Sequence, residues 1–270
     1  MAVVGSFAGA CAMSAALGRV EVREQSQVAR VVLSNPGKFN AMSRKMWQEL
    51  AAVFKVLNDR SDLRCVIVAG EDGHFCAGGD IAEYPGFRFD EAALRDFHEN
   101  EVWGGLQAVL DCPVPVIAQI QGNCMGAGVE IASCCDLRLA GQGARFGAPI
   151  ARLGFPMAPR EAQLVAREVG TVVARSMLLE AAVFDAETMY QKGFLNAVLP
   201  DAAVAGEVTQ RAAVVSKLAP QAARMNKRTL KTLAIHGLSE RLLSEAYSYA
   251  DSAEHREGIA AFLSKRSPAF

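Results

Sequence analysis

The sequence lacks the short motifs that would assign a function at once. It contains no G-x-G-x-x-G and no G-x-x-x-x-G-K-[ST], so the phosphate cradles of dinucleotide-binding and P-loop proteins are not expected. It contains no G-x-S-x-G, so nothing supports the nucleophile elbow of an α/β-hydrolase. Its formal net charge is only −1, which gives no electrostatic reason to expect nucleic acid or an anionic membrane as a partner.

Metal-ligand and redox patterns are missing as well. The seven cysteines are an odd number, and none of their spacings is that of a C-x-x-C pair or a zinc site. Because they lie in mostly apolar surroundings, we expect buried free thiols in a reducing cytoplasm and no metal. The four histidines, at positions 74, 98, 236 and 255, have no triad-like company, so we interpret them as surface or structural residues.

The N-terminal stretch also lacks charge. Residues 1–17 are small and apolar, without the positive start of a secretory signal, and too rich in Ala, Gly and Ser for a membrane span. We expect them to form a disordered tail. The remaining length, with 51% hydrophobic residues, is enough to bury a large core.

The pattern of apolar residues changes along the chain. Residues 20–34 alternate like a β-hairpin, whereas 43–58 has helical spacing with Ser43 as its N-cap. Apolar runs predict strands over 65–70 and 114–120, and shorter strands over 136–140 and 145–147. Beyond Arg160 strands nearly vanish, and we predict helices over about 160–169, 171–180, 185–192, 202–218, 220–235, 238–250 and 254–266.

Two glycine-rich turns are the most informative features present. One, His74–Ile81, follows the strand 65–70, and the other, Gly122–Glu130, follows the strand 114–120. A glycine turn that leads into a helix leaves backbone N–H groups unpaired at the positive end of the helix dipole. Two such turns that converge on one point would form an oxyanion hole, which stabilises negative charge developing on a carbonyl oxygen.

Glu130 lies four residues after Gly126, one helical turn from the second of these sites. A carboxylate placed there is suited to general acid–base work on a bound carbonyl compound. The same position equally suits a first-turn glutamate that only complements the helix dipole. Spacing alone leaves both interpretations open. Asp80, after the first turn, has the position of a helix-capping residue.

A series of ordered motifs resembles the crotonase, or enoyl-CoA hydratase/isomerase, superfamily from about Val20 to Phe270. They are LSNPGKFNAM (33–42), FCAGGDI (75–81), PVIAQIQG (115–122), GAGVE (126–130), CDLRLA (135–140), RFG (145–147), GFLNAV (193–198) and EGIAAFLSKR (257–266). The resemblance implies an α/β fold: a spiral of β-β-α repeats over 18–200, followed by a C-terminal helical region over 201–270 that mediates trimerisation.

The resemblance also implies a function, in which the chain acts on an acyl-CoA thioester through an enolate. By position, the N–H groups of Gly79 and Ala127 would hold the thioester oxygen, and Glu130 would be the acid/base. No cofactor is implied, because coenzyme A is part of the substrate. A cytoplasmic homo-trimer or dimer of trimers is expected, without nucleic-acid or membrane partners. The residues expected to contact CoA are Lys38, Phe39, Ala41, Ala77, Asp80, Ile81, Phe262 and Lys265.

One departure from the family pattern bears on the reaction. Hydratases of this family use a second glutamate, and its position here is Ile150, which cannot transfer a proton. The loop 154–161 also differs from the glycine-rich loop of typical hydratases, and we expect Pro156 and Arg160 at the pocket. Arg160 and Glu161 are candidates to replace the missing second glutamate, although we expect a surface role for both. One carboxylate suffices for double-bond isomerisation more readily than for hydration. The alternative is an acyl-CoA-binding homologue with little or no hydratase turnover.

Overall fold

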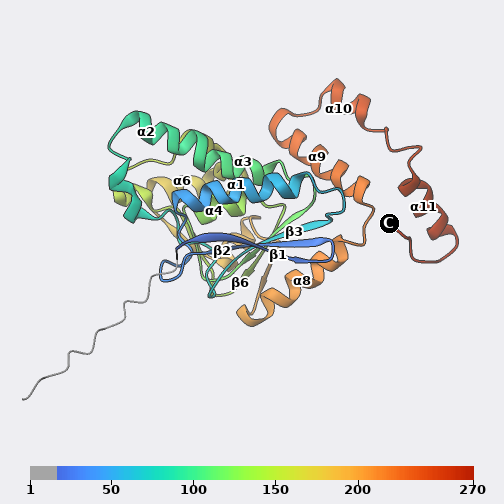
Figure 1. The fold of residues 1–270 in the computed structure, drawn as a ribbon, viewed down its shortest axis with the longest axis horizontal. Helices are drawn as coiled ribbons and strands as arrows, with labels where there is room; N and C mark the ends of the chain where they lie inside the picture. Colours follow the sequence, from blue (N-terminus) through green and yellow to red (C-terminus); the bar gives the residue numbers. More distant parts are fainter. Residues whose placement is uncertain (1–16) are drawn as a thin grey trace, which may run out of the picture.

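The centre of the protein is a six-stranded sheet, seen in a computed structural model that describes residues 17–270 (Figure 1). The expected hairpin is confirmed, since β1 and β2 pair antiparallel, and every other neighbouring pair of this sheet is parallel. Burial on both faces explains the continuous apolar runs of the central strands. In spatial order the strands are β1 (Arg19–Gln25), β2 (Val28–Ser34), β3 (Cys65–Gly70), β4 (Val116–Ile120), β6 (Leu137–Gly141) and β9 (Ala197–Leu199).

A second, three-stranded sheet carries the shorter strands. It is ordered β5 (Asn123–Met125), β7 (Arg145–Gly147) and β8 (Val183–Asp185). β5 and β7 pair parallel, and β7 and β8 pair antiparallel. Because β5 is part of the second glycine turn, its pairing in this sheet holds the turn in position.

Helices within residues 44–191 lie on the side of one face of the main sheet (Figure 1). In α1 (Arg44–Asn58) the hydroxyl of Ser43 accepts a hydrogen bond from the N–H of Met46, as expected of an N-cap. The apolar side of α1 is buried against α3 (Trp103–Leu110) and the sheet. The others are α2 (Glu91–Asp96), α4 (Ala127–Ser133), α5 (Pro159–Val169), α6 (Thr171–Leu179) and α7 (Ala186–Gln191).

Short irregular helices join these elements. Three are 3₁₀ turns, and the fourth, η2, is π-helical. The segment 81–102, for which no strand or helix is predicted above, is ordered around η1, α2 and η2. The four are η1 (Ile81–Gly86), η2 (Phe97–Val102), η3 (Ile150–Leu153) and η4 (Asp201–Ala203).

The opposite face of the sheet is covered by α8 (Val204–Val215). Its Val204 and Val208 are fully buried against side chains such as Ile67 and Ile117. Thus α8 packs on the sheet although it falls within the region 201–270 that the sequence assigned to the C-terminal helices. The division at residue 201 and the role of that region in assembly stay predictions.

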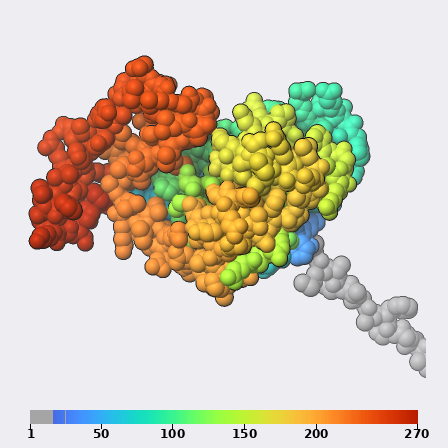
Figure 2. Space-filling view, turned by 180° about the vertical axis from the view of Figure 1, so that it is seen from behind, coloured from blue at the N-terminus to red at the C-terminus, as the bar shows by residue number. Residues whose placement is uncertain are grey.

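Three further helices extend away from the sheet as an arm (Figures 1 and 2). They are α9 (Pro220–His236), α10 (Glu240–Glu245) and α11 (Ala253–Leu263). The helix expected over 238–250 is shorter, since residues 246–250 form turns; Tyr247 in them is 72% exposed, and a helix without packing is marginal. No helix within residues 17–270 is long and apolar enough to cross a membrane.

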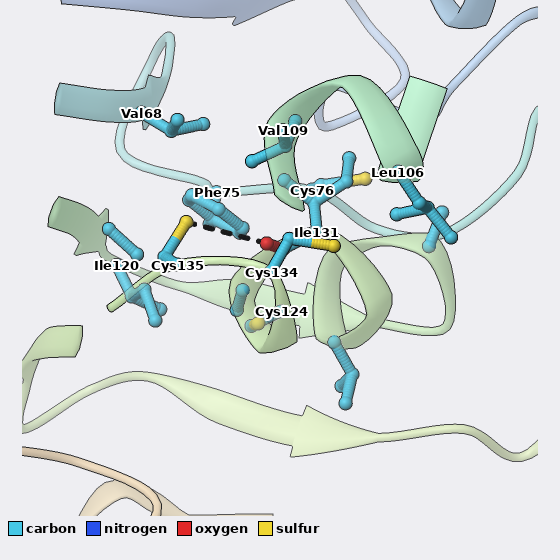
Figure 3. Close-up of a cluster of buried hydrophobic side chains, with 14 of the residues drawn as sticks. Val68, Phe75, Cys76, Leu106, Val109, Ile120, Cys124, Ile131, Cys134 and Cys135 are labelled. Carbon is cyan, nitrogen blue, oxygen red and sulfur yellow. Dashed lines mark hydrogen bonds between the residues drawn. The ribbon is translucent and has the colours of Figure 1, made fainter. Parts of the chain in front are cut away.

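The cysteines of residues 17–270 are buried and unbridged, as the sequence indicates. Five of them belong to one apolar cluster with Phe75; Figure 3 labels Cys76, Cys124, Cys134 and Cys135, and the fifth is Cys112. Burial raises the pKa of Cys76 to about 12, so its thiol stays protonated. Cys11 and the tail expected over 1–17, apart from Leu17, lie outside the described residues.

Candidate active site

The two glycine turns are joined through their backbones. The N–H of Cys76 donates to the carbonyl of Asn123 at 2.8 Å, and the N–H of Met125 donates to the carbonyl of Cys76 at 2.9 Å. A Cβ atom at Gly128 would lie 2.5 Å from the carbonyl oxygen of Cys76, so only glycine permits this approach. The segments after β3 and β4 therefore form one unit.

Gly79 and Ala127 border the same cavity, which has a volume of about 260 Å³. The flanking residues of Gly79 bond to Met42, an arrangement that leaves the N–H of Gly79 free. Ala127 begins α4, where N–H groups have no partner within the helix. Neither N–H donates a hydrogen bond to any residue in 17–270.

Glu130 lies in the first turn of α4 and also lines the cavity. Burial raises the pKa of its carboxyl to about 8, and the negative charge of Glu161 adds to the shift. In the described part of the chain no group donates a hydrogen bond to this carboxyl. Burial thus shifts the titration of Glu130 towards neutral pH, and no partner within residues 17–270 holds its carboxyl in place.

The wall opposite the glycine turns is largely apolar. Ile150 and Pro156 both line the cavity, as expected. Arg160 does not, because its guanidinium pairs with Glu99 at 2.9 Å and lies over the ring of Trp103, with its carbon 5.5 Å from the centroid. The expectation that Arg160 is a pocket residue is thus not supported by its position.

His98 corrects two expectations of the sequence. It lines the cavity from the π-helical segment η2, and its Nδ1 lies 2.9 Å from Oε1 of Glu161 in α5. Glu161 is only 2% exposed. The surface role expected for Glu161 is wrong, and so is the view that His98 has no triad-like company. The two residues are 63 positions apart, so no local pattern signals their contact.

Arg88 and two aromatic rings complete this side of the cavity. The Arg88 guanidinium carbon lies 4.5 Å from the ring centroid of Tyr84 and 4.0 Å from that of Phe155. Burial lowers the pKa of Arg88 and raises that of Tyr84 to about 12. The Tyr84 hydroxyl oxygen lies 2.1 Å from where a Cβ of Gly79 would stand, so this phenol and the first glycine turn are in direct contact.

The residues expected to contact CoA fall into two groups. In the first, Lys38 Nζ lies 2.6 Å from Asp80 Oδ2, and Asp80 also caps η1, as its position in the sequence predicts. The N–H of Ala77 donates to the carbonyl of Phe39, which ties the segment 38–41, with Ala41, to the first glycine turn. Of this group, Ala77 and Ile81 line the cavity.

The second group lies on the C-terminal arm. Phe262, in α11, is 82% exposed, and Lys265 follows that helix. Neither lines the cavity, and the arm extends away from the sheet (Figure 1). Their expected contact with CoA, on a neighbouring subunit, stays a prediction.

Comparison with known proteins places this geometry in a family. A family model described as enoyl-CoA hydratase/isomerase matches residues 23–270. A probable enoyl-CoA hydratase from Mycobacterium tuberculosis is 31% identical over 252 residues, covering 92% of this chain and 96% of that protein. The 2,3-dehydroadipyl-CoA hydratase of Escherichia coli is 29% identical over 252 residues, covering 92% and 97%. The crystal structure of an enoyl-CoA hydratase/carnithine racemase from Magnetospirillum magneticum matches with a TM-score of 0.90 at 33% identity, covering 94% and 96%.

The mixed α/β architecture is that of the crotonase class, as the sequence motifs indicate. Within that class, the chain belongs to the enoyl-CoA hydratase/isomerase family. It is an enzyme of the kind that acts on acyl-CoA thioesters.

Proposed function

We propose that the chain binds the thioester carbonyl of an acyl-CoA between the N–H groups of Gly79 and Ala127, and that Glu130 moves a proton at the adjacent carbon. This proposal rests on two N–H groups and one carboxyl that border a single cavity and have no hydrogen-bond partner within residues 17–270. Donors fixed before the reaction stabilise the enolate oxygen without the cost of reorganising solvent.

The electrostatics of Glu130 suit this role. A general acid or base works best when its pKa lies near the working pH, and burial places that of Glu130 at about 8. At neutral pH a small fraction of the carboxyls is ionised and able to remove an α-proton. The protonated majority is able to return a proton to the enolate.

We assign the residues that bind the CoA portion from their positions in the family motifs. Lys38 is 47% exposed beside the first glycine turn, where an ammonium group suits a phosphate of CoA. We place the remaining CoA contacts on Phe262 and Lys265 of a neighbouring subunit in a trimer or dimer of trimers. These two residues are too exposed on the arm to serve the cavity of their own chain.

A second candidate is an acyl-CoA-binding homologue with little turnover. It is favoured by Ile150, which presents an apolar side chain to the cavity where family hydratases carry a second glutamate. Under this hypothesis the N–H pair still binds the thioester, but no proton is transferred.

Proton exchange in heavy water separates the two candidates. The protein is incubated with saturated acyl-CoA thioesters of several chain lengths, and α-hydrogen exchange is followed by NMR. We expect exchange in the wild type and a loss of about 10²- to 10⁴-fold in Glu130→Gln. Glu91→Gln, at a glutamate that is 87% exposed on α2, is the matched control and is expected to exchange normally. Binding without exchange would support the second candidate, and no binding would refute both.

A further inference from the structure

The cavity contains an ionisable pair that the proposed function does not use. His98 and Glu161 come from different elements, η2 and α5, and meet at 2.9 Å. Glu161 has no other hydrogen-bond partner among the described residues, and its side chain is 3% exposed. A buried carboxylate is costly unless it is paired, so its contact with the imidazole holds the ring in place.

The contacts of His98 define which nitrogen is available. The Glu161 carboxylate accepts a hydrogen bond from Nδ1–H, which leaves the lone pair of the neutral ring on Nε2. Arg88 Nη1, which is only a donor, lies 3.4 Å from Nε2 and agrees with this tautomer. A histidine oriented at Nδ1 by a carboxylate resembles the general-base half of a catalytic triad, and a water molecule that takes the place of Arg88 Nη1 at Nε2 would find the proton acceptor there.

The backbone that carries His98 is unusual. Residues 97–102 form a π-helical turn between α2 and α3, and π-helical turns recur at functional sites. From this turn His98 reaches the same cavity as Glu130 and Ile150. The cavity thus has a proton-accepting side chain although residue 150 provides none.

We propose that His98 is a second catalytic proton-transfer group of this site and that Glu161 is its positioning residue. With both, the enzyme hydrates 2-enoyl-CoA thioesters even though residue 150 is isoleucine. The inference rests on the proposed function, because it requires the thioester to be held by Gly79 and Ala127.

The hydration step balances with the groups present. The oxygen of a water molecule forms a bond to C3 of the 2-enoyl thioester while one of its protons passes to Nε2 of His98. The C2=C3 electron pair moves to give an enolate, whose oxygen is held by the two N–H groups. The protonated carboxyl of Glu130 then donates its proton to C2. Afterwards the imidazolium loses a proton to solvent and the Glu130 carboxylate takes one up.

Two measurements on the same variants test this inference. The first is hydration of a series of 2-enoyl-CoA thioesters, followed by the loss of conjugated-thioester absorbance. The second is α-hydrogen exchange of saturated acyl-CoA thioesters in heavy water, which needs Glu130 but not His98. We expect His98→Asn to lose hydration by about 10²- to 10⁴-fold and to keep exchange within about threefold. His236→Asn, at the exposed end of α9, is the control and is expected to retain both.

Glu161→Gln tests the positioning role. Glu161 stabilises the imidazolium, whereas Arg88 disfavours it, and Glu130 and Tyr84 face the same cavity. Removing the carboxylate of Glu161 should therefore slow hydration at least tenfold, because the imidazole is no longer oriented, while α-hydrogen exchange stays within about threefold. Glu161→Asp, which keeps a carboxylate, should recover part of the lost hydration rate. A merely structural role would reduce hydration and exchange together.

The outcomes distinguish this inference from the proposed function. Normal hydration in His98→Asn, or a wild type that exchanges α-hydrogens but hydrates no 2-enoyl thioester, overturns the inference alone. A wild type that neither exchanges nor hydrates overturns both.

Discussion

Replacing Glu130 by glutamine should stabilise the protein, and by more at alkaline than at acidic pH. The folded chain keeps the Glu130 carboxyl protonated up to about pH 8, whereas the unfolded chain releases that proton near the ordinary value of 4.5. Between these values the folded state binds more protons than the unfolded state, so the free energy of unfolding falls as pH rises. The loss is complete above about pH 8.

The size of the effect follows from the separation of the two pKa values. Each pH unit between the two pKa values lowers the free energy of unfolding of the wild type by about 1.36 kcal/mol. Between about pH 5 and pH 8.5 this amounts to about 4 kcal/mol, and the free energy of unfolding of Glu130→Gln should not show this decrease. The melting temperature of the variant, relative to the wild type, should therefore rise by roughly 10 °C between these two pH values.

Thermal unfolding followed by circular dichroism at both pH values measures this difference. Glu91→Gln, at an exposed position, should show the same small offset at both. If Glu130→Gln also shows an equal offset at both, the carboxyl titrates near its ordinary value, and its proposed role as a neutral acid loses its physical basis.

Three further outcomes follow from the same structure. The α-hydrogen exchange rate should rise with pH and level off above about pH 8, as Glu130 becomes the carboxylate that removes the proton; a rate independent of pH from 6 to 9 would contradict this. Gly128→Ala should lower the free energy of unfolding by about 1–3 kcal/mol in denaturant titrations because its Cβ meets a carbonyl oxygen, whereas Gly206→Ala, in open space on α8, should not; equal effects would refute the close approach. Adding Ile150→Glu to His98→Asn should restore at least tenfold of the lost hydration rate, since it places a carboxyl in the same cavity; no gain would mean that residue 150 does not reach the substrate.

The sequence was sufficient to predict the elements that depend on neighbouring residues alone. The hairpin of β1 and β2 follows from alternation, and α1 from its apolar spacing and its cap at Ser43. The glycine turns were also recognisable, because a strand, a glycine-rich segment and a helix occur in order. The two turns lie together because β3 and β4 pair in parallel, a pairing that the structure shows and that was not predicted from the sequence.

The rest depends on contacts between distant segments. His98 and Glu161 are separated by 63 residues, and His98 lies in a π-helical turn that the sequence pattern does not predict. The surface role expected of Glu161 failed because α5 turns this residue towards η2, whereas Arg160, one position earlier, faces Glu99. Residue spacing also could not predict that the Glu130 carboxyl is buried. It had left open a role in which Glu130 only complements the helix dipole.

A crystal structure with a non-reactive acyl-CoA analogue bound tests the central claim most directly. The account predicts that the thioester oxygen lies about 2.7–3.1 Å from both the Gly79 and the Ala127 nitrogen atoms, with the α-carbon beside the carboxyl of Glu130. An analogue whose thioester oxygen is bound by only one of these nitrogens, or by neither, would contradict it.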